Sequence, residues 1–391
     1  EAKNGITVMI TRIGDNIISS LGFTTKENYQ AVKSGQTGLR FYDSCLDLPE
    51  PLRASLIDKE RLNNCFAAIC EHPGNYTPLE QAAILSVSQA AEESGIDLSD
   101  PRVLFFFSST KGNVYLLGEK ESGFSRDHIY LWHTAQVVAG YFHNPNTPVV
   151  ISNACISGAA AQIAAMRELE VERGDYAVVT GVDLLSKFVV SGFQSLKALS
   201  TEICRPFDVA RSGLNLGEAA ATLIYKRAHA DDKEDIVLLQ GAIRNDANHI
   251  SGPSKTGEGS FLALKAILEN LTPEDLAFIN THGTATSYND RMESIAITRA
   301  GLNTVPVNSL KGYFGHTLGA AGVLESIISM QALQDRIVLP THGFENGEQE
   351  YPLKVVRTIS PAEKPHFVKT LSGFGGCNAA LLFKKKNGTE Y

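Results

Sequence analysis

The sequence predicts an α/β fold made of two similar halves. Short apolar segments, of the kind buried in parallel sheets, alternate along the chain with longer segments of helical periodicity. Two of the strand–turn–helix units also resemble each other, which indicates an internal duplication. The chain has 391 residues, enough for one large α/β unit or for two or three domains.

The elements follow one another in the order expected for such a fold. Thr77-Pro78-Leu79-Glu80 is a capping box with proline at the first helical position, and the helix that it begins ends near Gly95. A fully apolar strand is expected at 103–107, and a helix at 159–169. Further strands are expected at 148–151, 176–180, 276–280 and 305–307. This alternation is typical of α/β architecture.

The duplication is predicted from two segments. P-V-V-I-S-N-A-C-I-S-G-A-A-A begins at Pro148, and V-P-V-N-S-L-K-G-Y-F-G-H-T-L-G-A-A-G begins at Val305. Each contains a strand, a polar turn and the Ala/Gly-rich start of a helix. We therefore expect two halves, 1–230 and 231–391, joined near the charged segment 228–234, with equivalent helix N-termini facing one centre.

Composition excludes several classes of protein. Hydrophobic residues make up 43% of the chain and charged residues 20%, as in ordinary globular proteins, and no apolar run is long enough to span a membrane. The formal net charge of −8 argues against a surface that coats nucleic acid. Six cysteines without CxxC spacing resemble neither a disulfide framework nor a zinc site. We expect a reduced, cytoplasmic protein with no membrane anchor.

Cys155 is the first candidate for chemistry. It follows a strand of apolar, buried type and lies at the N-terminus of a predicted helix, where backbone N–H groups and the helix dipole favour a thiolate. A lone cysteine beside alanines is nevertheless more often a small buried hydrophobe. A catalytic role for Cys155 therefore depends on partners elsewhere in the sequence.

Two histidines lie in comparable places. His282 follows the apolar strand 276–280, and His316 lies in the second helix-start turn. Either histidine on its own is more often a structural residue. All three residues, the two histidines and Cys155, lie in turns of small residues, and this coincidence favours an active site. A thiolate beside two imidazoles suits acyl transfer, whereas a metal site lacks a recognisable third ligand at helical spacing. A third turn, 373–378, is rich in glycine and is either a ligand-binding turn or a simple link between strands.

Six ordered motifs resemble the β-ketoacyl-acyl carrier protein synthases, which belong to the thiolase-like superfamily. They are A-C-I-S-G around Cys155, C-R-P-F-D at 204–208, G-E-A-A at 217–220, H-G-T-A-T at 282–286, K-G-Y-F-G-H-T-L-G-A-A-G at 311–322 and G-F-G-G-C-N at 373–378. The resemblance implies the duplicated α/β/α/β/α five-layered fold and a homodimer. It also implies a condensation of an enzyme-bound acyl group with malonyl-acyl carrier protein, in fatty acid or polyketide/aryl-polyene-type synthesis.

The resemblance assigns a role to each matching residue. Cys155 would be the acyl-accepting nucleophile, and His282 and His316 would assist decarboxylation and stabilise the enolate. Lys311 would be the active-site lysine, paired with Glu325. Phosphopantetheine would arrive on the acyl carrier protein, so no resident cofactor and no metal are expected.

Further residues match the family's binding positions. Phe374 would be an aromatic gate whose backbone N–H forms the oxyanion hole together with that of Cys155. Phe193 would be a second gating residue, although a core aromatic is almost as good an interpretation. Thr284 and Thr286 would bind phosphopantetheine, and Lys197 would lie where the acidic carrier protein docks.

Two positions depart from the family pattern. Lys111 stands where a small or apolar residue is more typical of the acyl pocket, and Cys377 stands where threonine is common. Two alternatives remain open at this point. One is a thiolase-type acyl-CoA acyltransferase, in which Cys377 would serve as base. The other is a catalytically silent chain-length partner of an active synthase.

Overall fold

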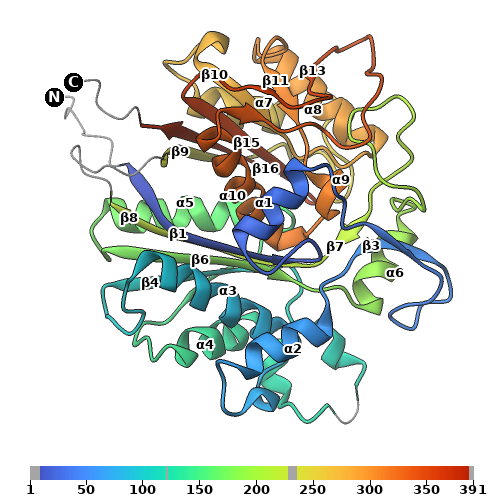
Figure 1. Cartoon of the computed structure of the whole chain (residues 1–391). Helices are drawn as coiled ribbons and strands as arrows, with labels where there is room; N and C mark the ends of the chain where they lie inside the picture. The colour runs from blue at the N-terminus through green and yellow to red at the C-terminus, as the bar shows by residue number, and fades with distance from the viewer. Residues whose placement is uncertain (1–8, 120–121, 228–235, 387–391) are drawn as a thin grey trace.

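The structure is a computed structural model that describes residues 9–119, 122–227 and 236–386 (Figure 1). Its main feature is an 11-stranded mixed sheet of order β13-β11-β10-β15-β16-β9-β1-β8-β6-β4-β5. The two ends of this sheet form separate layers. One layer contains β1 (Ile10–Ser19), β8 (Ala219–Arg227), β6 (Tyr176–Asp183), β4 (Val103–Ser108) and β5 (Val149–Ile151). The other contains β9 (Ile236–Asn245), β16 (Cys377–Lys385), β15 (His366–Gly373), β10 (Leu276–Asn280), β11 (Pro306–Asn308) and β13 (Lys354–Val355).

Helices fill the space between the layers and cover both outer faces. Figure 1 shows α5 (Ser157–Glu170) and α10 (Ala321–Gln334) between the two sheet layers. On the outer faces, α3 (Pro78–Ser94) and α4 (Leu131–Tyr141) cover one layer, and α7 (Glu258–Ile267) and α8 (Ser287–Arg299) cover the other. The result is the five-layered α/β/α/β/α arrangement that the resemblance implies. The remaining helices are α1 (Thr25–Lys33), α2 (Lys59–Ala67), α6 (Lys187–Ser195) and α9 (Lys311–Phe314).

The two sheet layers have the same topology. From the shared β1–β9 edge, each layer continues with two antiparallel pairings and then two parallel ones, and β13 adds one more parallel pairing to the second layer. β5 and β11 occupy equivalent places, and each leads into one of the two central helices. The predicted duplication of the fold is thus confirmed. The expected boundary between halves, near 228–234, lies outside the described residues and stays a prediction.

The predicted local structure is found at the expected places. The capping box at the start of α3 is complete, since Thr77 Oγ1 accepts the N–H of Glu80 at 3.3 Å and Glu80 Oε2 accepts the N–H of Thr77 at 2.8 Å. The strand at 148–151 is the exception. It is expected to be buried, but β5 pairs only with β4 at the edge of the sheet, and Val149 is 43% exposed. An apolar run does not reveal whether its strand is central or at an edge.

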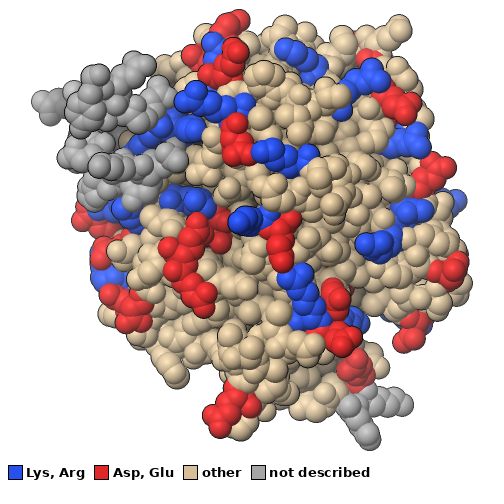
Figure 2. Space-filling view, viewed as in Figure 1, with Lys and Arg blue, Asp and Glu red and all other residues tan. Residues whose placement is uncertain are grey.

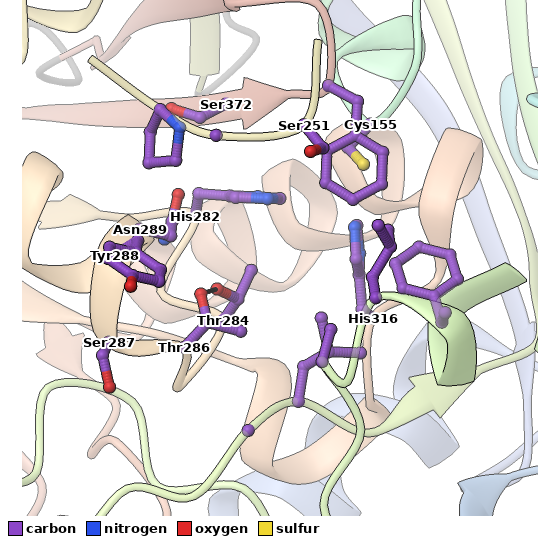
Figure 3. Close-up of a pocket in the computed structure, with 18 of the residues that line it drawn as sticks. Cys155, Ser251, His282, Thr284, Thr286, Ser287, Tyr288, Asn289, His316 and Ser372 are labelled. Atoms are coloured by element: carbon purple, nitrogen blue, oxygen red, sulfur yellow. Dashed lines mark hydrogen bonds between the residues drawn. The ribbon is translucent and has the colours of Figure 1, made fainter. Parts of the chain in front are cut away.

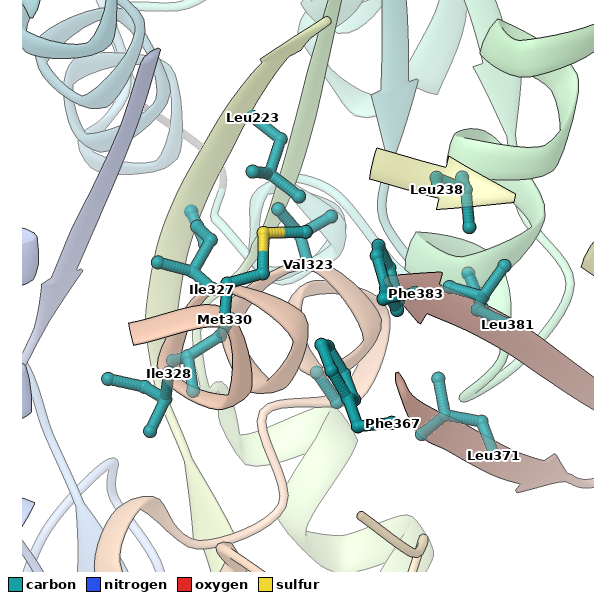
Figure 4. Packing of buried hydrophobic residues seen from close by; sticks show 14 of the residues in the cluster. Leu223, Leu238, Val323, Ile327, Ile328, Met330, Phe367, Leu371, Leu381 and Phe383 are labelled. Carbon is teal, nitrogen blue, oxygen red and sulfur yellow. The ribbon is translucent and has the colours of Figure 1, made fainter. Parts of the chain in front are cut away.

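The central layer is closely packed. Side chains of α10, among them Val323, Ile327 and Met330, meet Phe367 and Phe383 of the neighbouring strands in one core cluster (Figure 4). At their N-terminal ends, α5 and α10 approach backbone to backbone. A Cβ atom on Gly322 would lie only 2.4 Å from the backbone nitrogen of Ala159. Only glycine permits this approach, which brings the turns before the two helices together.

The surface and the helices agree with the composition. On the face shown in Figure 2, basic and acidic side chains are interspersed rather than gathered into a large patch of one sign. Within the part of the chain that the structure describes, none of the helices has the length and apolar character needed to cross a membrane.

Candidate active site

Three turns bring Cys155, His282 and His316 together. Cys155 lies directly before α5, His316 lies shortly before α10, and His282 follows the carboxyl end of β10. One ligand atom from each of the three residues lies within 4.8 Å of the others, and all three side chains are buried. The two imidazole rings meet edge to face, with centroids 5.0 Å apart, and both lie beside Cys155 in Figure 3.

The turn that carries Cys155 is held by local hydrogen bonds. Ser157 Oγ accepts the N–H of Asn153 at 2.8 Å and donates to the carbonyl oxygen of Ala154 at 2.6 Å. Ala154 has a φ of 45°, in the left-handed region that L-residues rarely adopt. This strained turn fixes the direction in which the Cys155 side chain enters the site.

The Cys155 thiol is protonated at neutral pH. Burial raises the pKa of Cys155 to about 12, and Cys377 adds to this rise, whereas Lys311 and Lys111 oppose it. Burial thus opposes the thiolate form that a helix N-terminus favours. The loss of hydration in the buried turn is the largest cause of this rise in the pKa of Cys155.

Both histidines are neutral. Burial is the main cause that lowers the pKa of His282 and of His316 well below 6.5, and the nearby Lys311 lowers both further. His316 Nδ1 accepts the N–H of Leu318 at 3.3 Å, so the ring proton lies on Nε2. That Nε2 is buried and has no hydrogen-bond partner among the described residues. It is therefore a donor ready for a ligand atom.

Lys311 and Glu325 lie behind the histidines. Both side chains are buried, and Lys311 Nζ forms an ion pair with Glu325 Oε1. A second lysine, Lys369 on β15, lies 2.6 Å from the other oxygen of Glu325. Sequence reasoning missed Lys369, although a lysine inside the otherwise apolar and small-residue strand H-F-V-K-T-L-S-G was a signal that could have been noticed.

Two buried carboxylates of α8 hold the His282 turn. Glu293 accepts the N–H groups of His282 at 2.9 Å and Gly283 at 2.7 Å. Asp290 accepts the N–H of Thr284 at 3.0 Å, and burial raises the pKa of Asp290 to about 7. Sequence reasoning missed both, because a pair of acidic residues three apart on a helix usually marks an exposed face.

A cavity of about 490 Å³ connects these residues to the surface. Most of the predicted site residues line it. They are Cys155, Phe193, Lys197, His282, Thr284, Thr286, His316 and Phe374. Phe193 and Phe374 stack with centroids 5.8 Å apart, and the hydroxyl oxygens of Thr284 and Thr286 lie 2.9 Å apart. The cavity is therefore a channel with walls of mixed polarity, and the buried Cys155 thiol lies on it beside the two imidazoles (Figure 3).

The two unusual positions lie off the channel. Cys377 is buried at the start of β16, where its Sγ lies 3.3 Å from the carbonyl oxygen of Phe374. Lys111 is exposed, and its loop is held by Asp183, which accepts the N–H of Thr110 at 2.9 Å.

The group of a thiol and two imidazoles can serve either acyl transfer or metal binding. These residue types are among the ligands that Zn²⁺ takes. Among the described residues, no further histidine, cysteine or acidic side chain joins the group at ligand distance. The absence of a resident metal stays a prediction.

Comparison with known proteins supports the family resemblance. Residues 13–230 match the family model of the β-ketoacyl synthase N-terminal domain, and residues 236–345 match that of the C-terminal domain. The 3-oxoacyl-acyl-carrier-protein synthase 2 of Vibrio harveyi is 33% identical over 255 residues, 61% of either chain. The enzyme of the same name from Vibrio cholerae is 28% identical over 97% of this chain and 99% of its own.

The extent of these matches varies. The chain spans about three fifths of the length of the first curated relatives, namely 60%, 61% and 64%. Among solved structures, a ketosynthase in complex with its chain length factor from Xenorhabdus doucetiae is similar with a TM-score of 0.86. It is 23% identical, and the match covers 99% of this chain and 100% of that chain. A β-ketoacyl synthase from Burkholderia phymatum is similar with a TM-score of 0.84, at 24% identity, over 97% and 100% of the two chains. The fold is thus thiolase-like, and the chain belongs to the β-ketoacyl synthase family.

Proposed function

We propose that the protein catalyses a decarboxylating Claisen condensation. An acyl group bound to Cys155 would react with malonyl-acyl carrier protein to give β-ketoacyl-acyl carrier protein and carbon dioxide, in fatty acid or polyketide/aryl-polyene-type synthesis. One observation carries the proposal: a buried thiol and two neutral imidazoles lie within 4.8 Å of one another on the channel.

The first half-reaction transfers the acyl group. The Cys155 sulfur attacks the carbonyl carbon of the acyl thioester, and the bond from that carbon to the phosphopantetheine sulfur breaks. The proton of Cys155 ends on the departing phosphopantetheine thiol. Because burial raises the pKa of Cys155 to about 12, the proton must leave as the new bond forms. The buried thiol is thereby kept unreactive toward other electrophiles until a substrate is in place.

The second half-reaction makes the carbon–carbon bond. Malonyl thioester loses carbon dioxide, and the electron pair of the broken bond moves to the thioester oxygen as an enolate. Two neutral imidazoles placed in advance stabilise this charge, and each such donor is worth about 3–4 kcal/mol. The enolate carbon then attacks the acyl carbon on Cys155, and the bond from that carbon to the cysteine sulfur breaks. The sulfur takes up one proton from solvent, so each condensation consumes one proton.

The walls of the channel fit the other assigned roles. Gly373 approaches the site so closely that a Cβ atom there would lie 3.1 Å from the backbone nitrogen of Cys155. This closeness supports an oxyanion hole made by the N–H groups of Cys155 and Phe374, with Phe374 and Phe193 as gates. Thr284 and Thr286 present hydroxyl groups to a passing phosphopantetheine arm. Lys197 provides a cation for an acidic carrier protein.

Cofactor requirement, cellular location and assembly belong to the same proposal. The phosphopantetheine arrives on the carrier protein, so the reaction needs no resident cofactor. We propose a cytoplasmic homodimer. In its support, β5 leaves one side unpaired within the described sheet, and Val149 on this strand is 43% exposed, which suits pairing with a second copy.

Acylation of Cys155 tests the proposal directly. The purified protein is incubated with acyl-carrier proteins of increasing chain length, and the intact mass is measured. We expect an acyl adduct on the wild type and on Cys65→Ala, a control variant in α2, and no adduct on Cys155→Ala. A silent chain-length partner would show no Cys155-dependent adduct with any chain length. A thiolase-type enzyme would instead condense two acetyl-CoA molecules and ignore malonyl-acyl carrier protein.

The assignment of the second half-reaction has its own test. We expect His316→Ala to form the acyl adduct and to lose release of carbon dioxide from malonyl-acyl carrier protein. Wild-type condensation by this variant would contradict the role given to His316.

A further inference from the structure

Lys369 is a buried lysine close to the site. It is the one lysine, arginine, aspartate or glutamate in its strand, β15. It lies in the middle of β15, between β10 and β16, and only 1% of it is exposed. Phe367 and Leu371, two positions away on either side, pack in the same core cluster as α10. Since side chains two apart share one face of a strand, Lys369 projects toward the central helices. A cation in this layer is tolerated only if it is fully paired.

Four oxygen atoms lie within 3.5 Å of the Lys369 ammonium nitrogen. Its Nζ lies 2.6 Å from Glu325 Oε2 and donates to the carbonyl oxygens of Thr281 at 3.0 Å and Thr370 at 2.9 Å. The carbonyl oxygen of Asn280 accepts a further hydrogen bond at 3.5 Å, whereas Glu325 Oε2 is a charge contact without a hydrogen bond among the described residues. Thr281 directly precedes His282, and Glu325 also pairs with Lys311. One ammonium group therefore joins the carboxylate behind the site to the backbone that carries a site histidine.

The charges around Lys369 come from three other elements. Glu325 lies on α10, Lys311 is the first residue of α9, and Glu293 lies on α8. Together with Lys369 they form an alternating set of two cations and two carboxylates behind His282 and His316. Burial lowers the pKa of Lys369 to about 8, with Glu325 opposing the change and Lys311 adding to it. Lys369 in turn lowers the pKa of both histidines.

We propose that Lys369 is a positioning residue for the second half-reaction: it holds Glu325 and the Thr281–His282 backbone so that the imidazoles face the developing enolate. The inference rests on the proposed function. Lys369 lines no part of the channel and does not contact Cys155, so the transfer of an acyl group to the thiol does not depend on it. Loss of its proton would leave Glu325 Oε2 buried without a cation and would weaken the link to Thr281.

Three variants test this role. Lys369→Met removes the charge at similar length, Lys369→Arg keeps a charge that does not titrate below pH 12, and Lys385→Met is the matched control. Lys385 also extends from the sheet to α10, where it donates to the carbonyl oxygen of Gln334 at 3.0 Å, far along the helix from Glu325. Acyl-adduct formation, carbon dioxide release and condensation are each measured from pH 6.5 to 9.

We expect Lys369→Met to form the acyl adduct as the wild type does and to release carbon dioxide roughly 10- to 100-fold more slowly, as when a supporting partner of a catalytic group is lost. The wild type should lose decarboxylation activity above about pH 8, the pKa of Lys369. Lys369→Arg should retain more activity than Lys369→Met and should lack this alkaline decline. Lys385→Met should match the wild type in every assay.

Several results would overturn the inference. One is an equal loss of adduct formation and decarboxylation in folded Lys369→Met, and another is an unchanged alkaline decline in either Lys369 variant. If Lys369→Met does not fold, the pH profile of Lys369→Arg decides the question. The measurements on the wild type distinguish a failure of this inference from a failure of the proposed function. A wild type with no Cys155-dependent adduct and no carbon dioxide release contradicts the proposed function itself, whatever the variants do.

Discussion

Replacing Gly322 with alanine perturbs the backbone contact between α5 and α10. The new Cβ would lie 2.4 Å from the backbone nitrogen of Ala159 and 2.7 Å from the carbonyl carbon of Gly158, whereas ordinary contacts of a Cβ begin at 3.4 Å. The helices would have to move about 1 Å apart in a close-packed layer. Overpacking of this kind costs about 1–3 kcal/mol, and the backbone atoms at this crossing leave no side chain to yield, so the cost is at the upper end.

The same substitution, glycine to alanine, should change stability in the opposite direction in a helix that lacks this contact. Gly140 lies in α4, and a Cβ atom there would meet nothing within 4 Å. Alanine restricts the unfolded chain more than glycine does, so Gly140→Ala should stabilise the protein by about 0.5 kcal/mol. For Gly322→Ala this gain, up to about 1 kcal/mol in a helix, offsets only part of the overpacking. The expected net result is a loss of about 2 kcal/mol.

Urea unfolding followed by far-UV circular dichroism measures both variants. Gly322→Ala should unfold at lower urea than the wild type, and Gly140→Ala at slightly higher urea. Because the crossing sets how close Cys155 comes to His316, Gly322→Ala should also slow condensation while Gly140→Ala does not. A Gly322→Ala protein as stable as Gly140→Ala would refute the backbone contact between the helices.

Three further outcomes are expected. Thr77→Ala removes the hydroxyl that caps α3 and should lower the free energy of unfolding by about 1 kcal/mol. An unchanged free energy would contradict the hydrogen bond from the N–H of Glu80 to Thr77 Oγ1. Phe374→Ala should slow acylation of Cys155 but leave the free energy of unfolding within about 0.5 kcal/mol of the wild-type value, since Phe374 is 41% exposed and stacks on Phe193. A buried histidine with a lowered pKa gives stability that is present above pH 6.5 and is lost as the pH falls below it, when the unfolded chain binds the extra proton. His316→Asn should therefore reduce the loss of stability between pH 6.5 and 5.5 by up to about 1.4 kcal/mol per pH unit, and an unchanged loss would contradict burial of a neutral His316.

The sequence predicts much of this architecture because local signals agree with the fold. The capping box at Thr77, the apolar strands and the two similar strand–turn–helix units all have their expected forms in the structure. Each signal depends on neighbours in the chain. The exposure of β5 depends instead on which strands lie beside it in the sheet. Its apolar sequence contains no information on this, and it therefore predicts a buried strand.

The partners of the site were harder to predict for the same physical reason. Lys369 lies 44 positions after Glu325 in the chain, and their ion pair exists only because β15 and α10 pack together. The carboxylates of Asp290 and Glu293 accept backbone N–H groups, and no sequence pattern marks such acceptors. The protonation state of Cys155 depends on burial, which a helix N-terminus read from the sequence does not include.

The matching strand–turn–helix units that begin with β5 and β11 place two turns opposite each other across a local twofold relation. In the chain the two turns carry different residues, Cys155 in one and His316 in the other. An assembly of two identical chains would have to place the same residue in both turns. Joining the halves in one polypeptide removes this restriction, so that one turn can carry a thiol and the other an imidazole. The asymmetry of the site is thus a property that a symmetric pair of identical halves cannot have.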